Sequence, residues 1–394
     1  MSRMRILIAG AGLGGLTAAA CLLRRGHDVA VFEQAPQLGE IGAGIQISAN
    51  ANRVFAEIGV ADRVAEAGAL PREYRFRTFD TGEVLQTIHF GTSYEERWGV
   101  PYVSIHRADL HAILVDAVRA LRADAIQLNR RTVGYEEDSG GVTLRFADGT
   151  TERGDVVVGA DGIRSAVREQ ILGRVEADYT GDSVWRVLVS SERLPEEHRT
   201  DCVEIFVGPG KHCVVYPLRG GRLINLVGCV EQAGWDEESW TTKRPWEEMR
   251  DDFRGWNPMV NAIIEAAPRD ECYRWVLKNR KPVGNWSTSR ATLLGDAAHP
   301  TLPYMAQGSA MAVEDAAVLA RALDREPAVA DALLLYQRNR LDRTARVVNE
   351  STANRALFHM KNMAALREAF AKRDFSGERN AWLFSYDATR VELV

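Results

Sequence analysis

Three glycines near the N-terminus, Gly10, Gly12 and Gly15, have the spacing G-x-G-x-x-G. They follow the apolar run 5–9, which is typical of a buried parallel strand, and Leu13 begins a stretch with helical periodicity. In such a turn the first glycine permits a tight bend, the second lets a pyrophosphate approach the backbone, and the third lets the helix pack on the strand. Amides at the helix N-terminus would bind the phosphates, so these residues predict a dinucleotide site.

An acidic residue follows at the distance that this arrangement requires. Glu33 ends a second apolar run, 28–32, roughly 20 residues after the glycines. A carboxylate there accepts hydrogen bonds from an unphosphorylated adenosine ribose, as in FAD or NAD. We include the neighbouring Gln34 in the predicted site. The motif by itself does not distinguish FAD from NAD.

Two later runs repeat the pattern of an apolar segment that ends in a glycine. The valines at 156–158 lead into Gly-Ala-Asp-Gly at 159–162, and 291–294 lead into Gly-Asp-Ala-Ala-His-Pro at 295–300. An acid at a strand end beside a helix N-terminus can accept hydrogen bonds from hydroxyl groups. The order and wide separation of these runs indicate one FAD contacted by three distant segments.

A glycine-rich loop at 38–47 is a further candidate contact. Its glycines would let the backbone lie against a planar ring, and Ile45 and Ile47 are expected to be half-buried behind it. The alternative is an ordinary surface loop.

The length of 394 residues exceeds the ~250–300 at which one core usually stops growing, so two domains are expected. Between 183 and 229 the pattern changes to short strand-like runs separated by Gly/Pro turns, which predicts an inserted antiparallel sheet. The fold class is therefore α/β, with a Rossmann-like FAD-binding domain, an inserted antiparallel-sheet substrate domain and a long C-terminal helix. The predicted FAD-binding domain is discontinuous (1–73, 97–180 and 270–331), the substrate-binding domain comprises 74–96 and 181–269, and 332–394 form a C-terminal helical segment.

Composition excludes several other classes. A net charge of -5, without a basic stripe, argues against nucleic acid as a partner. No run approaches the ~18 apolar residues of a membrane span, and the first apolar run is too short for a signal peptide. The five cysteines have no metal-binding spacing, and their odd number suits reduced thiols, so we expect no metal and a cytoplasmic protein.

With these features, the chain resembles the single-component FAD-dependent aromatic monooxygenases of the para-hydroxybenzoate hydroxylase fold. It looks most like the branch of the salicylate hydroxylases, 3-hydroxybenzoate 6-hydroxylases and 6-hydroxynicotinate 3-monooxygenases. The resemblance covers nearly the whole length and rests on the runs 6–15, 106–111, 159–165 and 294–308. It implies FAD as cofactor, NADH or NADPH as co-substrate, and by analogy a homodimer.

The resemblance also assigns cofactor contacts. It implies that Arg107 lies near the FAD phosphates and ring, and that Asp296 hydrogen-bonds the ribitol chain. Asp161 would hold the FAD-binding architecture or bear on nicotinamide binding. The alternative for that run is a helix N-terminus that Ser165 helps to cap. The backbone of Pro303 would lie at the flavin edge where oxygen adds, and Gly308 closes the same motif. A glutamine is expected at the Pro303 position in 3-hydroxybenzoate 6-hydroxylases, so the proline favours a salicylate-type or nicotinate-type substrate.

Two residues of the inserted sheet are candidates for catalysis. His212 and Tyr216 share the strand-like run 211–217, and their even spacing puts both side chains on one face. Relatives have a histidine and a tyrosine there, which implies His212 as the base and Tyr216 as a hydrogen-bonding partner of the substrate. Both could instead be core residues. Tyr304 is a further substrate candidate.

The expected reaction is hydroxylation of a small hydroxylated aromatic acid, salicylate-like or 3-hydroxybenzoate-like, by O2 and NAD(P)H through a flavin hydroperoxide. The alternatives are a decarboxylating hydroxylase of the 6-hydroxynicotinate type and a flavin-binding protein without hydroxylase activity. A substrate carboxylate needs cations or amides facing it. Arg186 and Arg219 are available, but the sequence does not say which way they point.

Overall fold

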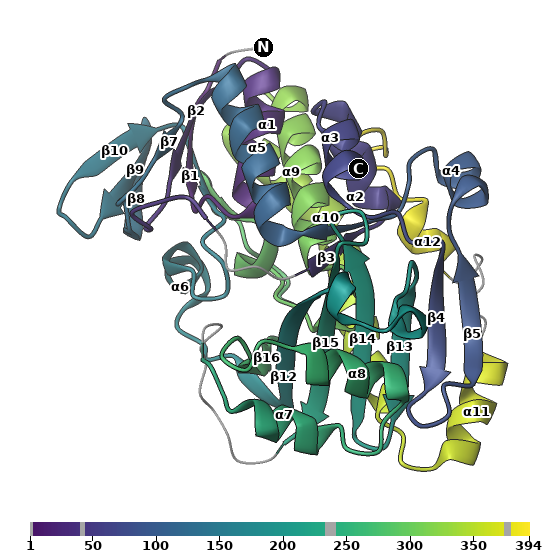
Figure 1. Cartoon of the computed structure of the whole chain (residues 1–394). Helices are drawn as coiled ribbons and strands as arrows, with labels where there is room; N and C mark the ends of the chain where they lie inside the picture. The colour runs from purple at the N-terminus through teal and green to yellow at the C-terminus, as the bar shows by residue number, and fades with distance from the viewer. Residues whose placement is uncertain (1–2, 40–43, 233–241, 374–379) are drawn as a thin grey trace.

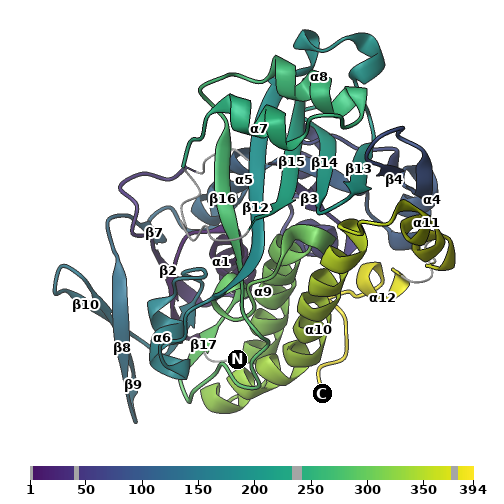
Figure 2. The ribbon, with the colours of Figure 1, turned by 90° about the horizontal axis from the view of Figure 1, so that it is seen from below.

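The computed structural model describes residues 3–39, 44–232, 242–373 and 380–394. Two sheets form its frame (Figure 1), a parallel sheet in the upper half of the view and a larger, mainly antiparallel sheet in the lower half. The long helix α10 (Val329–Phe358) packs beside α9 (Gly308–Arg325), as the view from below in Figure 2 shows.

The parallel sheet is built from the predicted apolar runs. Its order is β17-β11-β1-β2-β7, with the glycine turn after the central strand. Helices α1 (Leu13–Arg24) and α5 (Arg107–Leu121) pack on one side together with α9 (Figure 1). The strands are β1 (Arg5–Ala9), β2 (Asp28–Phe32), β7 (Ile126–Gln127), β11 (Val156–Gly159) and β17 (Ala291–Leu293).

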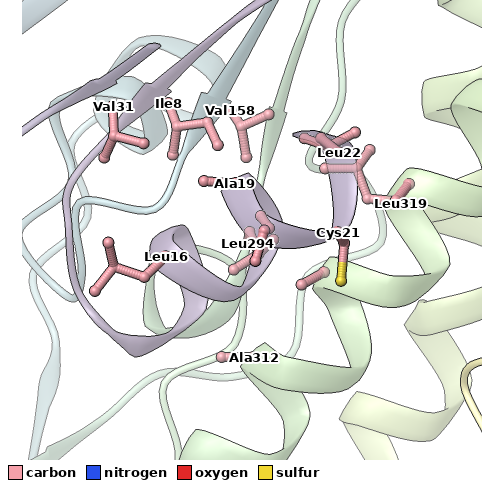
Figure 3. Close-up of a cluster of buried hydrophobic side chains, with 14 of the residues drawn as sticks. Ile8, Leu16, Ala19, Cys21, Leu22, Val31, Val158, Leu294, Ala312 and Leu319 are labelled. Atoms are coloured by element: carbon pink, nitrogen blue, oxygen red, sulfur yellow. The ribbon is translucent and has the colours of Figure 1, made fainter. Parts of the chain in front are cut away.

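Close packing between α1 and this sheet forms the first core. Figure 3 shows Ile8 and Val31 of the sheet lying over Leu16 of α1, with Leu319 of α9 beyond. All four side chains are fully buried. Burial of side chains of this size contributes about 1.5–3 kcal/mol each, which fixes the glycine turn at the end of β1.

The larger sheet has the order β16-β12-β15-β14-β13-β4-β5, and all its neighbours are antiparallel except the pair β13 and β4. Helices α7 (Trp246–Asp252) and α8 (Pro258–Ala266) cover one face around Trp185 and Phe206. The opposite face packs toward α10 and the C-terminal residues. The strands are β4 (Glu73–Thr78), β5 (Val84–His89), β12 (Asp178–Ser190), β13 (Val203–Gly208), β14 (Lys211–Leu218), β15 (Leu223–Glu231) and β16 (Tyr273–Asn279).

The remaining elements are short. A three-stranded sheet packs against β1 and β11, and a two-stranded sheet joins β3 to β6. These strands are β3 (Gly44–Ile47), β6 (Val103–His106), β8 (Thr132–Asp138), β9 (Gly141–Phe146) and β10 (Thr151–Gly154). The other helices are α2 (Ala49–Glu57), α3 (Ala61–Ala67), α4 (Thr92–Trp98), α6 (Ala166–Leu172), α11 (Met363–Lys372) and α12 (Ala381–Phe384).

The predicted fold class is confirmed, with differences in detail. The range 270–331, which we assigned to the FAD-binding domain, contains β16, and this strand pairs with β12 in the larger sheet. The loop predicted at 38–47 forms β3 from Gly44 onward, and its residues 40–43 lie outside the described part. All five cysteines are buried free thiols. Within the described ranges, no helix is long and apolar enough to cross a bilayer.

Candidate active site

The three glycine-containing runs meet at the carboxyl ends of neighbouring parallel strands. The Ala160 amide donates to the Ala9 carbonyl at 2.9 Å, and the Leu294 amide donates to the Gly159 carbonyl at 3.0 Å. A Cβ on Gly10, where φ is +100°, would lie 2.5 Å from the Ala160 oxygen. The segments that the sequence separates are thus in direct contact.

The N-terminal glycines have three different surroundings. A Cβ on Gly15 would lie 2.1 Å from the Gly10 oxygen, so helix α1 can approach the strand only without a side chain there. Nothing lies within 4 Å of the corresponding position on Gly12, which faces open space. Leu13, the first residue of α1, is buried. An open, side-chain-free backbone before a buried helix start is what a pyrophosphate requires, so these residues fit FAD.

Glu33 lies beside this turn. One carboxylate oxygen accepts a hydrogen bond from the Ala11 amide at 2.9 Å and the other accepts from the Ala35 amide at 2.9 Å. Each oxygen keeps a further acceptor position for a ribose hydroxyl. Gln34, by contrast, is exposed.

Asp296 lies in the 3-10 turn η3 (Gly295–Ala297) that follows β17. Its side chain is accessible to solvent although protein surrounds it densely, which is the situation of a residue that lines a recess. Desolvation raises the pKa of its carboxyl, while the positive charges of Arg107 and His299 oppose the rise. Arg107 begins α5 and lies close enough to Asp296 for its charge to act on that carboxyl. A contact of Arg107 with FAD stays a prediction.

Asp161 has a definite structural role. One oxygen accepts from the Ala166 amide at 2.8 Å and, more weakly, from the Val167 amide at 3.4 Å, at the start of α6. Its other oxygen is buried with no hydrogen-bond partner among the described residues, and burial raises the pKa of the carboxyl. Capping of α6 therefore explains the position of only one of the two carboxylate oxygens of Asp161.

The face of the larger sheet opposite α7 and α8 presents the catalytic candidates. His212 and Tyr216 of β14 lie on this face, and Tyr216 rests on β3, where a Cβ on Gly44 would lie 2.5 Å from its ring. Val227 pairs with Val214 of β14 and with Arg186 of β12. Residues directly opposite in antiparallel strands share a face, so Arg186 faces the same side as both candidates.

Arg186 and Asn225 carry donors without acceptors. Arg186 is 4% exposed, lies over the rings of Tyr273 and Trp275, and has one terminal nitrogen with no hydrogen-bond partner in the described ranges. Burial lowers the pKa of its guanidinium. The Asn225 oxygen accepts from the Gly44 amide at 3.3 Å, while its buried nitrogen has no partner among the same residues. These are the donors that a buried anion would need.

The other arginine considered from the sequence does not face this side. Arg219, in the turn after β14, forms two hydrogen bonds of 2.8 Å with the carboxylate of Asp109 on α5. It links the two domains near the surface, since 40% of its side chain is exposed.

Tyr304 and Pro303 lie in the 3-10 turn η4 (Pro303–Met305). Pro303 is exposed, as a residue at a flavin edge could be. The Tyr304 hydroxyl donates to the buried carboxylate of Asp182 at 2.5 Å, so it is already engaged. A cavity of about 60 Å³ beside Tyr304 has aromatic walls that include Tyr74, Phe76, Phe90, Tyr102 and Phe358.

Gly308 and Ile45 flank the recess from two further elements. Gly308 is the first residue of α9, whose N-terminus adjoins the loop that carries Asp296. Ile45 is half-buried in β3, where it pairs with Ile105. Their contacts with FAD stay predictions.

Sequence reasoning missed the residues behind the candidates. His212 is hydrogen-bonded to His359, and Arg355 holds Asp182 at 2.6 and 2.7 Å. His359 and Arg355 belong to the C-terminal segment, far along the chain. The only signal in the sequence for these two residues is that their side chains are ionisable.

A second buried group supports the loop of Asp296. Asp315 of α9 accepts hydrogen bonds from the Gly295 amide at 3.0 Å and from the His299 ring at 2.6 Å. Arg340 of α10 donates to Asp315 at 2.7 Å and to Glu314 at 2.6 Å. The nearby cations lower the pKa of the Asp315 carboxyl to about 2 despite its burial.

Together, the strand-turn-helix glycines, the acid after β2 and the recess at Asp296 define an FAD-binding protein of the Rossmann type with a second, substrate-facing sheet. Comparison with known proteins agrees. Residues 3–351 match the family described as FAD binding domain, and the chain belongs to that family.

Similar proteins share almost the full length. The chain is 38% identical to the 3-hydroxybenzoate 6-hydroxylase of Polaromonas naphthalenivorans (strain CJ2), over 92% of this chain and 90% of that protein. It is 36% identical to the 6-hydroxynicotinate 3-monooxygenase of Pseudomonas fluorescens, over 99% and 97%. The crystal structure of Klebsiella pneumoniae HpxO complexed with FAD and uric acid superimposes with a TM-score of 0.85, at 30% identity over 97% and 96%. The chain is thus an FAD-dependent monooxygenase of the aromatic hydroxylase type.

Proposed function

We propose that the protein hydroxylates a small hydroxylated aromatic acid, using O2 and NADH or NADPH. The observation that supports an acidic substrate is the buried guanidinium of Arg186, on the sheet face of His212 and Tyr216. One of its terminal nitrogens has no hydrogen-bond partner among the described residues. A buried cation without a counterion is costly, and a ligand carboxylate would compensate it. The amide nitrogen of Asn225 offers a second donor nearby.

The bound FAD would supply the two-electron reduction of O2 and the transfer of one oxygen atom to the ring. The protein's own residues prepare the substrate. Burial lowers the pKa of His212 well below its usual range, so its imidazole is neutral and has a lone pair that can accept a hydrogen bond from a ring hydroxyl. The same burial makes it a weaker base, so removal of the hydroxyl proton requires a group that takes the proton onward. Loss of that proton makes the ring electron-rich. Tyr216, whose pKa burial raises, stays protonated and donates a hydrogen bond.

Two relatives act, by their names, on molecules that combine a ring hydroxyl with a carboxylate. That combination matches the pair His212 and Arg186, which supports the substrate class. Pro303 favours salicylate or a hydroxynicotinate over 3-hydroxybenzoate, by the resemblance described above. A decarboxylating reaction of the 6-hydroxynicotinate type is the second candidate. Cytoplasmic location and a homodimer stay predictions.

A panel of hydroxylated benzoates and nicotinates tests this function. NADH oxidation, oxygen incorporation and hydrogen peroxide should be measured for each acid, and at least one acid should stimulate oxidation with oxygen incorporated. A protein that binds flavin yet responds to no acid would favour a flavin-binding protein without hydroxylase activity.

Substitution of Arg186 tests the carboxylate contact. Arg186→Met should raise KM for the best acid about 10- to 150-fold, since a charge-assisted hydrogen bond contributes about 1.5–3 kcal/mol. Arg186→Lys should restore part of the affinity. The control Arg222→Met, at an exposed position in the turn between β14 and β15, should leave KM unchanged. An unchanged KM in Arg186→Met would remove the argument for an acid.

A further inference from the structure

Two buried histidines connect the site to the surface. Nδ1 of His212 lies 2.8 Å from Nε2 of His359, and Nδ1 of His359 lies 3.3 Å from a carboxylate oxygen of Glu231. The two histidines are 2% and 4% exposed, whereas 35% of the Glu231 side chain is exposed. The three residues thus form a continuous path of proton-carrying groups from β14 to solvent.

We propose that His359 and Glu231 conduct the proton of the substrate hydroxyl from His212 to solvent. Neither residue touches the substrate; both act through His212. This inference rests on the proposed function, in which His212 accepts that proton. Nε2 of His212 is the nitrogen left for the substrate, since Nδ1 is occupied by His359 and no hydrogen bond joins Nε2 to a described residue.

The transfer conserves protons at each step. The substrate hydroxyl gives its proton to Nε2 of His212, and Nδ1 of His212 gives its own to Nε2 of His359. Nδ1 of His359 then gives its proton to the Glu231 carboxylate, which releases it to water. One proton enters and one leaves, and both rings change tautomer. The reverse sequence returns a proton to the ring oxygen when the product forms.

The charges around His359 suit conduction. The Asp182 carboxylate lies 4.0 Å away, but Arg355 and the Tyr304 hydroxyl already neutralise it. Arg355 also lies 3.7 Å from Glu231, and it opposes protonation of His359. Burial lowers the pKa of both histidines, so neither retains the proton.

His359 also has a structural role, because its backbone carbonyl accepts a hydrogen bond from the Gly210 amide at 3.1 Å. The test therefore uses His359→Gln, whose amide can keep both hydrogen bonds but cannot exchange protons as imidazole does. Glu231→Gln changes the exposed end, where folding is not at risk. His89→Gln, an exposed histidine on β5, is the control.

Oxidised enzyme should be mixed with salicylate, 3-hydroxybenzoate or 6-hydroxynicotinate in weak buffer, with an indicator dye that reports proton release and ultraviolet difference spectra that report the ionised ring. No turnover is needed. We expect proton release at least tenfold slower in His359→Gln and Glu231→Gln, with the flavin spectrum, the FAD content and the affinity for benzoate unchanged. His89→Gln should match the wild type.

Wild-type proton release in both variants, together with slow release in His212→Gln, would overturn the path while leaving His212 as the base. Wild-type release in His212→Gln, or failure of all three acids to bind, would instead overturn the proposed function. Loss of benzoate affinity in both variants would assign them a structural role and also refute conduction.

Discussion

Two residues of this site, His212 and Arg186, are buried and form no ion pair with another described residue. His212 is surrounded by the rings of Tyr304, Phe358 and His359, with centroids 4.8–5.3 Å away. Such surroundings disfavour the imidazolium form, which is why the pKa of His212 falls. The burial that keeps this imidazole neutral therefore makes the folded state sensitive to acid.

This sensitivity gives a prediction for stability. A histidine has a pKa of about 6.5 in the unfolded chain, and burial lowers the folded value of His212 below that. Its contribution to stability is present above about pH 6.5 and is lost as the pH falls, because the unfolded chain then binds the proton. His212→Gln should flatten the decline by up to about 1.4 kcal/mol per pH unit, measured by urea unfolding from about pH 7.5 to about pH 5. An equally steep decline in the variant would show that other groups cause it.

At the scale of elements, the turn between β1 and α1 places the cofactor. A Cβ on Gly10 would collide with Ala160, just after β11, and one on Gly15 would collide with Gly10, whereas a Cβ on Gly12 would meet nothing within 4 Å. Helix α1 is in turn held by the fully buried side chains of Figure 3. Between β1, α1 and the loop after β11, the backbone at Gly12 is therefore the stretch that no side chain covers.

Two glycine substitutions separate packing from cofactor binding. Gly12→Ala should leave the free energy of unfolding of the FAD-free protein within about 0.5 kcal/mol, because φ is -73° and the position is open. It should weaken FAD binding by at least about tenfold, since the methyl group occupies the phosphate approach. Gly15→Ala should destabilise the FAD-free protein by about 2 kcal/mol or more. Chemical denaturation and flavin fluorescence titration would measure both, and equal effects of the two changes would contradict the distinction.

At the scale of the whole molecule, the C-terminal segment joins the two sheets. Arg340 of α10 is fully buried between Glu314 and Asp315, and Asp315 supports the flavin loop through Gly295 and His299. The same helix ends at Phe358, directly before His359, which lies behind the substrate-facing sheet. One helix therefore positions both the cofactor loop and the partner of the predicted base.

Arg340→Met should lower both the free energy of unfolding and the affinity for FAD. It leaves two buried carboxylates with less compensation, which typically costs about 3–5 kcal/mol. FAD affinity should fall as well, because the loop around Gly295 loses its support. The matched control is Arg338→Met on the exposed face of α10, with an expected change within about 0.5 kcal/mol. A normal FAD affinity in Arg340→Met would mean that the loop holds its position without this ion pair.

Much of the frame was predictable because it depends on local patterns. The apolar runs ending at Ala9, Gly159 and Leu293 became neighbouring parallel strands, and period-two spacing correctly put His212 and Tyr216 on one sheet face. β16 was missed although Tyr273, Trp275 and Val276 are typical strand residues, and its antiparallel pairing with β12 identifies it.

The sequence by itself determined the nucleotide-binding turn, the acid after β2 and the class of flavoprotein, because these follow from residue types at short, fixed spacing. Only the tertiary structure decided that Arg186 points to the substrate face while Arg219 pairs with Asp109. It alone joined His212 to His359, 147 residues away. The physical reason is that side-chain direction, burial and partners come from packing between distant elements, which no local pattern encodes.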